Sequence, residues 1–285
     1  NGFNGFDLNN SEQIVGYSSL KDRGGQARAF IYENSTGKFT DITPDGWYGV
    51  IAKAINENGK IVGDGNIYDN SWALVVGIND YDNVPDLNYA VEDALAIKNM
   101  LINEFNFPRN NVRVLIDKEA SQSNINKEMS KLLKSAGVND RVIFYFAGHG
   151  ETVELGLEDG DAGFLIPSDA TDDLYFTAIP MEDLRSVSKF SKAKHMLFLV
   201  DACYSGLAAV NTRALSKKTP NYLDKITREN ARQIITAGRK DEKVLEKDEW
   251  EHSAFTKSII SGLKDKQANA NGDDFITGSE LGFYL

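Results

Sequence analysis

The two side chains of this sequence best suited to nucleophilic chemistry each follow an apolar run. His149 stands between two glycines directly after the apolar residues 142–147, and Cys203 comes three residues after the apolar run 195–200. A neighbouring imidazole favours the thiolate form of a cysteine and can protonate a departing amine. We therefore interpret Cys203 as a nucleophile and His149 as the general base and acid of an acyl-transfer site.

Acyl transfer also needs hydrogen-bond donors for the negative charge that develops on the attacked carbonyl oxygen. The backbone N–H groups of Gly150 and Cys203 are our candidates for this oxyanion hole, because backbone donors near the nucleophile are the usual supply. The glycines around His149 let backbone approach a ligand closely, which favours a functional role for this histidine. The other two histidines fit a different role. His195 begins a predicted strand and His252 a predicted helix, so we expect structural or solvent-facing side chains there.

Asp201 lies two residues before the cysteine, which in a strand places both side chains on the same side. A carboxylate there would select Lys or Arg as the residue before the cleaved bond, as fixed charges do in other protease subsites. The alternative is a carboxylate at the end of a strand that accepts hydrogen bonds from backbone N–H groups.

Composition narrows the class of protein. The 285 residues are 41% hydrophobic and 26% charged, which is ordinary for a globular protein, and no apolar run is long enough to span a bilayer. The formal net charge of −11 argues against a nucleic-acid partner. With one cysteine, no internal disulfide can form, so stability must come from packing.

The first 66 residues contain an internal repeat. Residues 8–16 match residues 55–63 at an offset of 47, and both copies predict a turn followed by a short strand. Between them, residues 29–32 and 38–42 predict a β-hairpin. Repeats of this length are stabilised by stacking on neighbours, so we expect further repeats upstream.

From residue 71 the pattern changes to alternating strands and helices, which predicts an α/β fold with a mostly parallel sheet sandwiched by helices. Ligands and catalytic groups collect at the carboxyl ends of such strands. The sequence does not fit a dinucleotide-binding protein, because Gly77 alone stands where three glycines are needed. The predicted strands are 72–78, 112–116, 142–147, 196–200 and 231–237, and the predicted helices are 87–104, 123–136 with Ser123 as its N-cap and Gly137 as its stop, 181–188 and 255–263.

Four motifs together resemble a known family. Residues 72–79, 87–94, 146–150 and 201–206 follow, in order, the caspase-like fold of metacaspases and bacterial orthocaspases, a resemblance that covers residues 71–285. The residues Arg28-Ala29-Phe30 stand where HAF repeats of bacterial extracellular proteins often have His-Ala-Phe. We therefore expect a small all-β segment of partial HAF-type repeats over residues 1–68, followed by a caspase-like peptidase domain over residues 69–285.

The resemblance implies a cysteine endopeptidase specific for basic residues. Cys203 and His149 alone fit caspase-like, legumain-like and gingipain-like chemistry, whereas Asp201 stands where metacaspases have Asp and caspases have Gln. The second acidic residue of the family's substrate subsite corresponds to Asp93 in this sequence. The alternative interpretation of Asp93 is an exposed carboxylate on a helix. The expected partner is a protein or peptide with Arg or Lys before the cleaved bond, and the expected state is a monomer.

Caspase-like zymogens are often cut into two subunits, and this chain offers a segment for it. The predicted processing linker is 207–230, and its residues 211–221 are rich in Thr, Ser and Lys. Within it, Arg213, Lys217 and Lys218 are candidate autocleavage sites. HAF-like repeats favour a bacterial, exported protein, whereas a reactive thiol suits a reducing cytoplasm, so the location stays open.

No cofactor is required by this chemistry, and calcium is a candidate regulator because many metacaspases need it. Asp159 and Asp161 lie in the acidic loop after the histidine, but Ala162 replaces one acidic residue of the family pattern. Asp273 and Glu280 belong to a segment that resembles half an EF-hand loop without Asp at its first position or Gly at its sixth. A capping box of Thr277 and Glu280 explains that spacing without a metal.

Two alternatives share the fold. A peptide ligase would resolve the acyl-enzyme with an amine in place of water. A catalytically silent module would use the α/β domain as a scaffold and the repeats for recognition, and the intact Cys203 and His149 argue against it.

Overall fold

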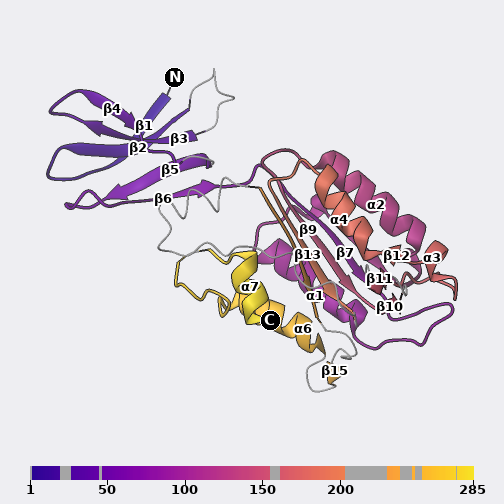
Figure 1. Cartoon of the computed structure of the whole chain (residues 1–285). Helices are drawn as coiled ribbons and strands as arrows, with labels where there is room; N and C mark the ends of the chain where they lie inside the picture. Colours follow the sequence, from indigo (N-terminus) through magenta and orange to yellow (C-terminus); the bar gives the residue numbers. More distant parts are fainter. Residues whose placement is uncertain are drawn as a thin grey trace. The chain divides into compact units, whose positions relative to one another are not determined.

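The computed structural model describes residues 2–19, 27–44, 47–154, 161–202, 230–237, 246–247, 252–273 and 275–285. The described residues form two compact units, which divide between Asp69 and Asn70 (Figure 1). Within the described part of the chain, no helix combines the length and the apolar character needed to cross a membrane.

The amino-terminal unit is entirely β. Strands β1 to β4 form an antiparallel sheet in sequence order, and β5 and β6 form a hairpin. The predicted hairpin of residues 29–42 is present as β3 and β4, joined by a turn in which Gly37 has a φ of 66°. The strands are β1 (Gly2–Leu8), β2 (Gln13–Ser19), β3 (Ala27–Glu33), β4 (Lys38–Asp41), β5 (Tyr48–Ile55) and β6 (Ile61–Asn66).

The internal repeat is visible in the turns that precede β2 and β6. Asn9 Oδ1 accepts hydrogen bonds from the backbone N–H groups two and four residues later, and Asn56 Oδ1 does the same in the second copy. Gly59 has a φ of 72°, and Glu12 at the equivalent position has a φ of 57°. The two turns also bond to each other, since Asn9 Nδ2 donates to the carbonyl oxygen of Asn56 at 3.3 Å. The two copies therefore share one turn structure.

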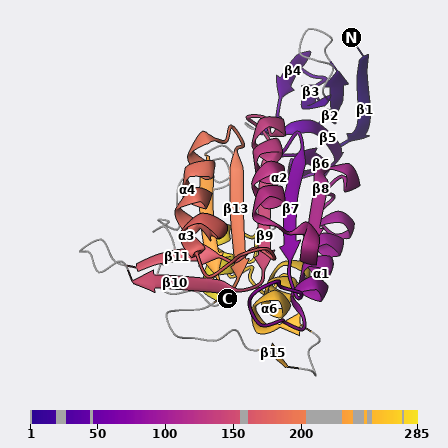
Figure 2. The ribbon, with the colours of Figure 1, turned by 90° about the vertical axis from the view of Figure 1, so that its right-hand side faces the viewer.

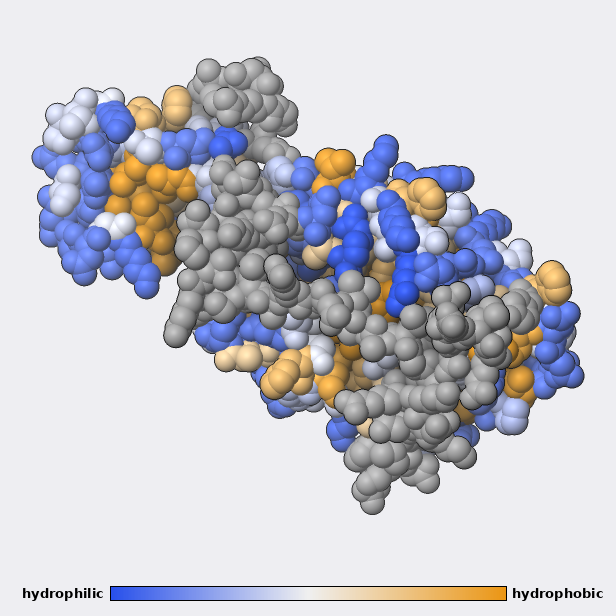
Figure 3. Space-filling model, in the orientation of Figure 1, coloured by the Kyte–Doolittle hydropathy of each residue, from blue (hydrophilic) through white to orange (hydrophobic). Residues whose placement is uncertain are grey.

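This unit also carries exposed aromatic residues. The Phe3 and Phe39 side chains are 56% and 51% exposed, and their rings lie 4.9 Å apart. Orange, apolar surface is visible on the unit in Figure 3, whereas the described surface over α2 and α4 of the second unit is mostly blue. The amino-terminal unit therefore presents apolar side chains outside its small core of Val15, Ala29, Val50, Ala52 and Ile55.

The second unit is built on a five-stranded parallel sheet in the order β14-β13-β9-β7-β8, as predicted for an α/β fold. The alternation of side chains along the strands supplies two cores, one on each face. Leu74 and Val76 point to one core, and Ala73 and Val75 to the other. The strands are β7 (Ser71–Gly77), β8 (Val112–Ile116), β9 (Arg141–Ala147), β13 (His195–Asp201) and β14 (Ala231–Thr236).

Helices cover both faces of this sheet (Figures 1 and 2). Helices α2 (Gln122–Ser135) and α4 (Met181–Phe190) pack on the face of Leu74, and α1 (Ala90–Asn103), α6 (Ala254–Lys264) and α7 (Gly278–Tyr284) on the opposite face. The smaller elements are the antiparallel strands β10 (Gly150–Glu154), β11 (Asp161–Leu165) and β12 (Ile179–Pro180), the helix α3 (Leu174–Thr177), the pair β15 (Glu246–Lys247) and β16 (His252–Ser253), and the 3-10 turns Arg109–Asn111 and Asp117–Glu119.

Three local expectations are corrected by the structure. The N-cap of α2 is Ser121 and not Ser123, because the Ser121 hydroxyl accepts the backbone N–H of Asn124 at 3.3 Å. Helix α1 begins at Ala90 and not at residue 87, since the backbone N–H of Leu87 is held in a turn by the carbonyl of Asn79. His252 lies in β16 and not in a helix.

Candidate active site

The strands that precede the two predicted catalytic residues are neighbours. Strands β9 and β13 pair in parallel with Ala147 opposite Asp201, and the backbone N–H of Gly148 donates to the Asp201 carbonyl at 3.2 Å. The chain therefore leaves both strands at the same edge of the sheet. Cys203, two residues beyond Asp201, lies outside the described residues, so its distance from His149 stays a prediction.

His149 is held by backbone and aromatic contacts on the loop that follows β9. Its Nε2 lies 2.7 Å from the carbonyl oxygen of Pro85, and its backbone N–H donates to the hydroxyl of Tyr81 at 2.8 Å. The two rings pack with their centroids 4.9 Å apart. If Nε2 carries the proton that Pro85 accepts, Nδ1 is left as the basic nitrogen.

Gly148 is needed for this arrangement. A Cβ atom at this position would lie 2.6 Å from the Tyr81 hydroxyl and 3.0 Å from the Phe146 ring, closer than side chains pack. Tyr81 is buried, and burial raises the pKa of its hydroxyl, which keeps the group neutral. The glycine before the histidine therefore makes room for the hydroxyl that holds the histidine backbone.

Asp201 is buried at the end of β13, and its two carboxylate oxygens have different surroundings. Its Oδ2 accepts hydrogen bonds from the hydroxyls of Ser253, Thr256 (2.7 Å) and Tyr145 (3.4 Å). Its Oδ1 has no hydrogen-bond partner within the described structure. Burial, with a further contribution from the nearby charge of Asp93, raises the pKa of the Asp201 carboxyl to about 7.

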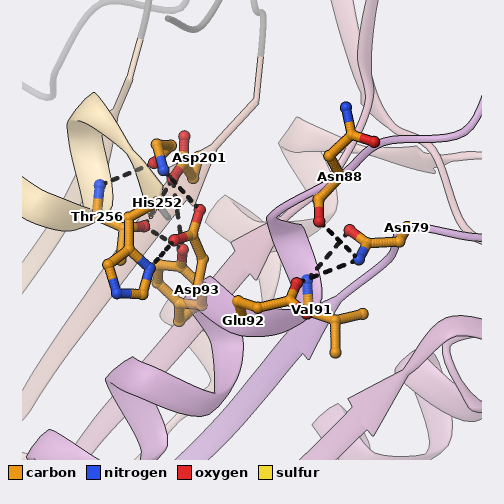
Figure 4. A network of polar contacts seen from close by, with 10 residues as sticks. Asn79, Asn88, Val91, Glu92, Asp93, Asp201, His252 and Thr256 are labelled. Atoms are coloured by element: carbon orange, nitrogen blue, oxygen red, sulfur yellow. Dashed lines mark hydrogen bonds and ion pairs between the residues drawn. The ribbon is translucent and has the colours of Figure 1, made fainter. Parts of the chain in front are cut away.

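Asp93 comes to the same place from α1 (Figure 4). It is only 1% exposed, so the alternative of an exposed helix carboxylate is wrong. Its Oδ1 lies 2.7 Å from Nδ1 of His252, and its Oδ2 accepts the backbone N–H of Ser253 at 3.2 Å. Burial raises the pKa of Asp93 as well. Asp93 and Asp201, whose negative charges are both disfavoured by burial, thus contact the same segment, residues 252–256.

Asn79 fixes the start of the helix that carries Asp93. Its Oδ1 accepts the backbone N–H of Val91 at 3.3 Å, and its Nδ2 donates to the Asn88 carbonyl and to Glu92 (Figure 4). The side chain of Asn79 thereby supplies an acceptor for the first turn of α1 from the loop after β7.

Sequence reasoning missed the residues that hold the two acidic groups. Thr256 and Tyr145 lie within helix or strand patterns and gave no signal. Ser253 had one, because its hydroxyl accepts the Thr256 backbone N–H at 3.0 Å as the N-cap of α6, and Ser before an apolar helix is a known start signal. His252 was assigned a structural or solvent-facing role, and its contact with Asp93 links residues 159 positions apart.

The other predicted residues are distributed as follows. Gly150 begins β10 opposite Leu165. Asp161 lies in β11, where its side chain is not described, and Asp273 and Glu280 lie in and after the loop before α7. No group of three or more His, Cys, Asp or Glu side chains is placed to hold a metal ion in the described ranges. Asp159, Arg213, Lys217 and Lys218 lie outside the described residues.

The sequence of the second unit matches a known protein family. Residues 70–276 match the model of the caspase domain. The chain is 32% identical over 145 residues to metacaspase-7 of Arabidopsis thaliana, which covers 47% of this chain and 34% of the relative. It is 29% identical over 148 residues to metacaspase-1 of Eremothecium gossypii, covering 49% and 32%. The match thus spans about a third of the length of these relatives.

One bacterial relative and one solved structure also match. The chain is 29% identical over 150 residues to a probable protease of a Desulfuromonadales bacterium, which covers 47% of this chain and 18% of the relative. A crystal structure of a Geobacter sulfurreducens protein matches with a TM-score of 0.50 and 17% identity over 70% of this chain and 83% of that chain. The latter is a likeness of fold alone.

Proposed function

This chain belongs to the caspase domain family, and we propose on that basis that it is a cysteine endopeptidase that cleaves peptide bonds after Arg or Lys. Cys203 is the nucleophile, His149 the base and acid, and Asp93 with Asp201 the subsite for the basic side chain, which we call the S1 subsite. The family membership supports the reaction class, and the geometry of the two acidic residues supports the specificity.

The observation that carries the specificity is the pair of buried carboxyls. Burial disfavours the negative charge of both carboxyls, the charge of Asp93 disfavours that of Asp201 further, and Asp201 Oδ1 has no partner in the described structure. A guanidinium or ammonium group placed between them would neutralise the charge and donate to that oxygen. An acidic or apolar side chain would leave the buried negative charge without a counter-charge and Asp201 Oδ1 without a donor. The site therefore favours a positively charged side chain.

The geometry of His149 supports its role as the base. With Nε2–H donated to Pro85, Nδ1 accepts the thiol proton of Cys203 as the sulfur attacks the carbonyl carbon. The oxygen becomes an oxyanion held by the backbone N–H groups of Gly150 and Cys203. The C–N bond then breaks as the imidazolium protonates the amine. Water attacks the thioester, His149 takes a water proton, and the C–S bond breaks to release the acid and the thiol.

The segment after Cys203 is the proposed site of self-processing. Arg213, Lys217 and Lys218 provide the basic residues that the S1 subsite would accept. Mass spectrometry of the purified chain should show cleavage after one or more of them, and Cys203→Ala should leave the chain intact. Processing that persists in Cys203→Ala would show that another protease is responsible.

For the amino-terminal unit we propose partial HAF-type repeats that act in recognition. The shared turn of Asn9 and Asn56 supports a true repeat, and the exposed rings of Phe3 and Phe39 provide contact surface. Removal of residues 1–69 should leave cleavage of small peptides unchanged and weaken cleavage of a protein substrate.

The enzyme assay that tests the proposed function compares three fluorogenic peptides ending in Arg, Lys and Asp, with and without calcium. The chain should cleave the Arg and Lys peptides and not the Asp peptide, and Cys203→Ala should cleave none. The matched control is Asp183→Asn, which removes an exposed carboxylate of α4 that is not part of the S1 subsite. Cleavage after Asp, or undiminished activity of Cys203→Ala, would refute the proposal.

A further inference from the structure

The segment from Asn269 to Glu280 lies between α6 and the first turn of α7 and is unusually rich in side-chain oxygens. Asn269, Asn271, Asp273, Thr277 and Glu280 occupy its first, third, fifth, ninth and twelfth positions. These are the spacings at which the EF-hand loop places its calcium ligands. Spacing alone does not establish a site, because the predicted capping box of Thr277 and Glu280 is present.

The second observation is a set of unsatisfied oxygens. Across the described residues, four buried side-chain oxygens lack a hydrogen-bond partner, and apart from Asp201 Oδ1 all belong to this loop. They are Asn269 Oδ1, Asp273 Oδ2 and Glu280 Oε1. Burying such acceptors without partners costs free energy, and native proteins rarely do so unless water or an ion satisfies them.

The hydrogen bonds of the loop fix the two carboxylates through one oxygen each and leave the second oxygen of each without a donor among the described residues. Asp273 Oδ1 accepts the backbone N–H of Phe275 at 2.7 Å, and Glu280 Oε2 accepts the backbone N–H and the hydroxyl of Thr277, each at 2.9 Å. Each carboxylate therefore uses one oxygen to shape the loop. The capping box accounts for only one oxygen of Glu280 and leaves the other buried and without a hydrogen-bond partner among the described residues.

We propose that residues 269–280 bind a calcium ion through Asn269 Oδ1, Asp273 Oδ2 and Glu280 Oε1. Carboxylate and amide oxygens are the ligands calcium prefers, and backbone carbonyls and water complete its usual six to eight. Magnesium fits less well, because it demands a strict octahedron and gives up its water reluctantly. With Asn at the first position, the site is weak, with a dissociation constant of about 10⁻⁴ to 10⁻³ M. This proposal does not depend on the peptidase activity.

The test uses the full chain carrying Cys203→Ala, so that no self-cleavage interferes. Calcium chloride at 10 mM should raise the midpoint of thermal unfolding by about 3 to 10 °C, and calorimetric titration should show one site. Asp273→Asn and Glu280→Gln keep an oxygen to accept the loop hydrogen bonds but lose the charge. Each should weaken calcium binding at least tenfold, and magnesium chloride should have less effect on the parent.

Two further variants separate a binding site from a merely structural loop. Asp265→Asn removes an exposed carboxylate at the end of α6 and should leave calcium binding unchanged. Asn269→Asp adds a carboxylate at the first position and should tighten binding several-fold, a gain that misfolding cannot produce. The proposal is overturned if calcium neither binds nor shifts the unfolding midpoint, or if the dissociation constant is the same in Asp273→Asn, Glu280→Gln and the parent.

Discussion

Nδ1 of His252 lies 2.7 Å from Oδ1 of Asp93, so one carboxylate of the proposed S1 subsite is already in contact with an imidazole of the same chain. The His252 side chain is 27% exposed, whereas that of Asp93 is buried. When protonated, this imidazole supplies the positive charge that a substrate side chain would otherwise bring. If Asp93 binds the basic side chain of the substrate as proposed, His252 and the substrate compete for it.

The competition predicts the effect of His252→Gln on substrate binding. The amide of Gln can still donate to Asp93 but never carries a charge. Removal of the competing imidazole should therefore lower the KM for an Arg peptide below that of the parent, and leave the KM for a matched citrulline peptide unchanged. Steady-state kinetics with both peptides check this, and an unchanged KM for the Arg peptide would contradict it.

A second prediction concerns the ionisation of Asp201, whose pKa is raised to about 7. Only the ionised carboxylate attracts a cation, so binding of benzamidine to the Cys203→Ala chain should be strongest above pH 7. It should weaken up to about tenfold for each pH unit below that value. Because the Cys203→Ala chain has no thiol, titration of Cys203 cannot cause this change in affinity. A benzamidine affinity that stays constant from pH 5.5 to pH 8 would show that Asp201 is not part of the subsite.

The same ionisation predicts a trend in stability. The folded pKa of Asp201, about 7, exceeds its ordinary value of 3.8, so the folded state holds the proton more tightly than the unfolded state. The resulting stability is complete below about pH 4 and is lost as the pH rises through 7. Denaturant unfolding should therefore show Asp201→Asn gaining a few kcal/mol relative to the parent between pH 4 and pH 8.

A fourth prediction tests the loop that holds His149, the proposed base. Gly148→Ala places a Cβ 2.6 Å from the Tyr81 hydroxyl and should cost about 1 to 3 kcal/mol of stability while lowering kcat at least tenfold. Gly137→Ala is the matched control, because its Cβ would lie 3.6 Å from the nearest atom, Asp140 Oδ2. Equal kcat values for the two alanine variants would mean that Tyr81 does not position His149.

A fifth prediction isolates the hydroxyl of Tyr81. Tyr81→Phe keeps the ring against His149 but removes the acceptor of the histidine backbone N–H. The loss of one hydrogen bond is worth about 1 kcal/mol, so kcat should fall about threefold to tenfold while KM stays the same. A change in KM with an unchanged kcat would place Tyr81 in substrate binding and not in positioning the base.

Much of the α/β scaffold follows from local sequence. Strand β8 has the predicted bounds, and β9 and β13 match because continuous apolar runs bounded by polar residues are typical of buried parallel strands. That His149 follows β9 is therefore readable from the sequence. The pairing of Ala147 with Asp201 is not, because strand order depends on packing between distant segments.

The residues around the S1 subsite show where sequence reasoning stops. Asp93 looks like any first-turn carboxylate of an amphipathic helix, and only packing of α1 beside residues 252–256 buries it. His252 and Thr256 likewise take their roles from contacts more than 50 residues away in the chain. Spacing rules describe one element at a time and do not report contacts between elements.

The central claim is that a buried acidic pair selects a positively charged side chain for cleavage by Cys203. The most direct measurement compares kcat/KM for two peptides that differ only in Arg or citrulline, its uncharged isostere, before the cleaved bond. The account predicts at least a hundredfold preference for Arg, and a preference reduced to a few-fold in Asp201→Asn. Equal kcat/KM values for the two peptides, or an unchanged preference in Asp201→Asn, would contradict it.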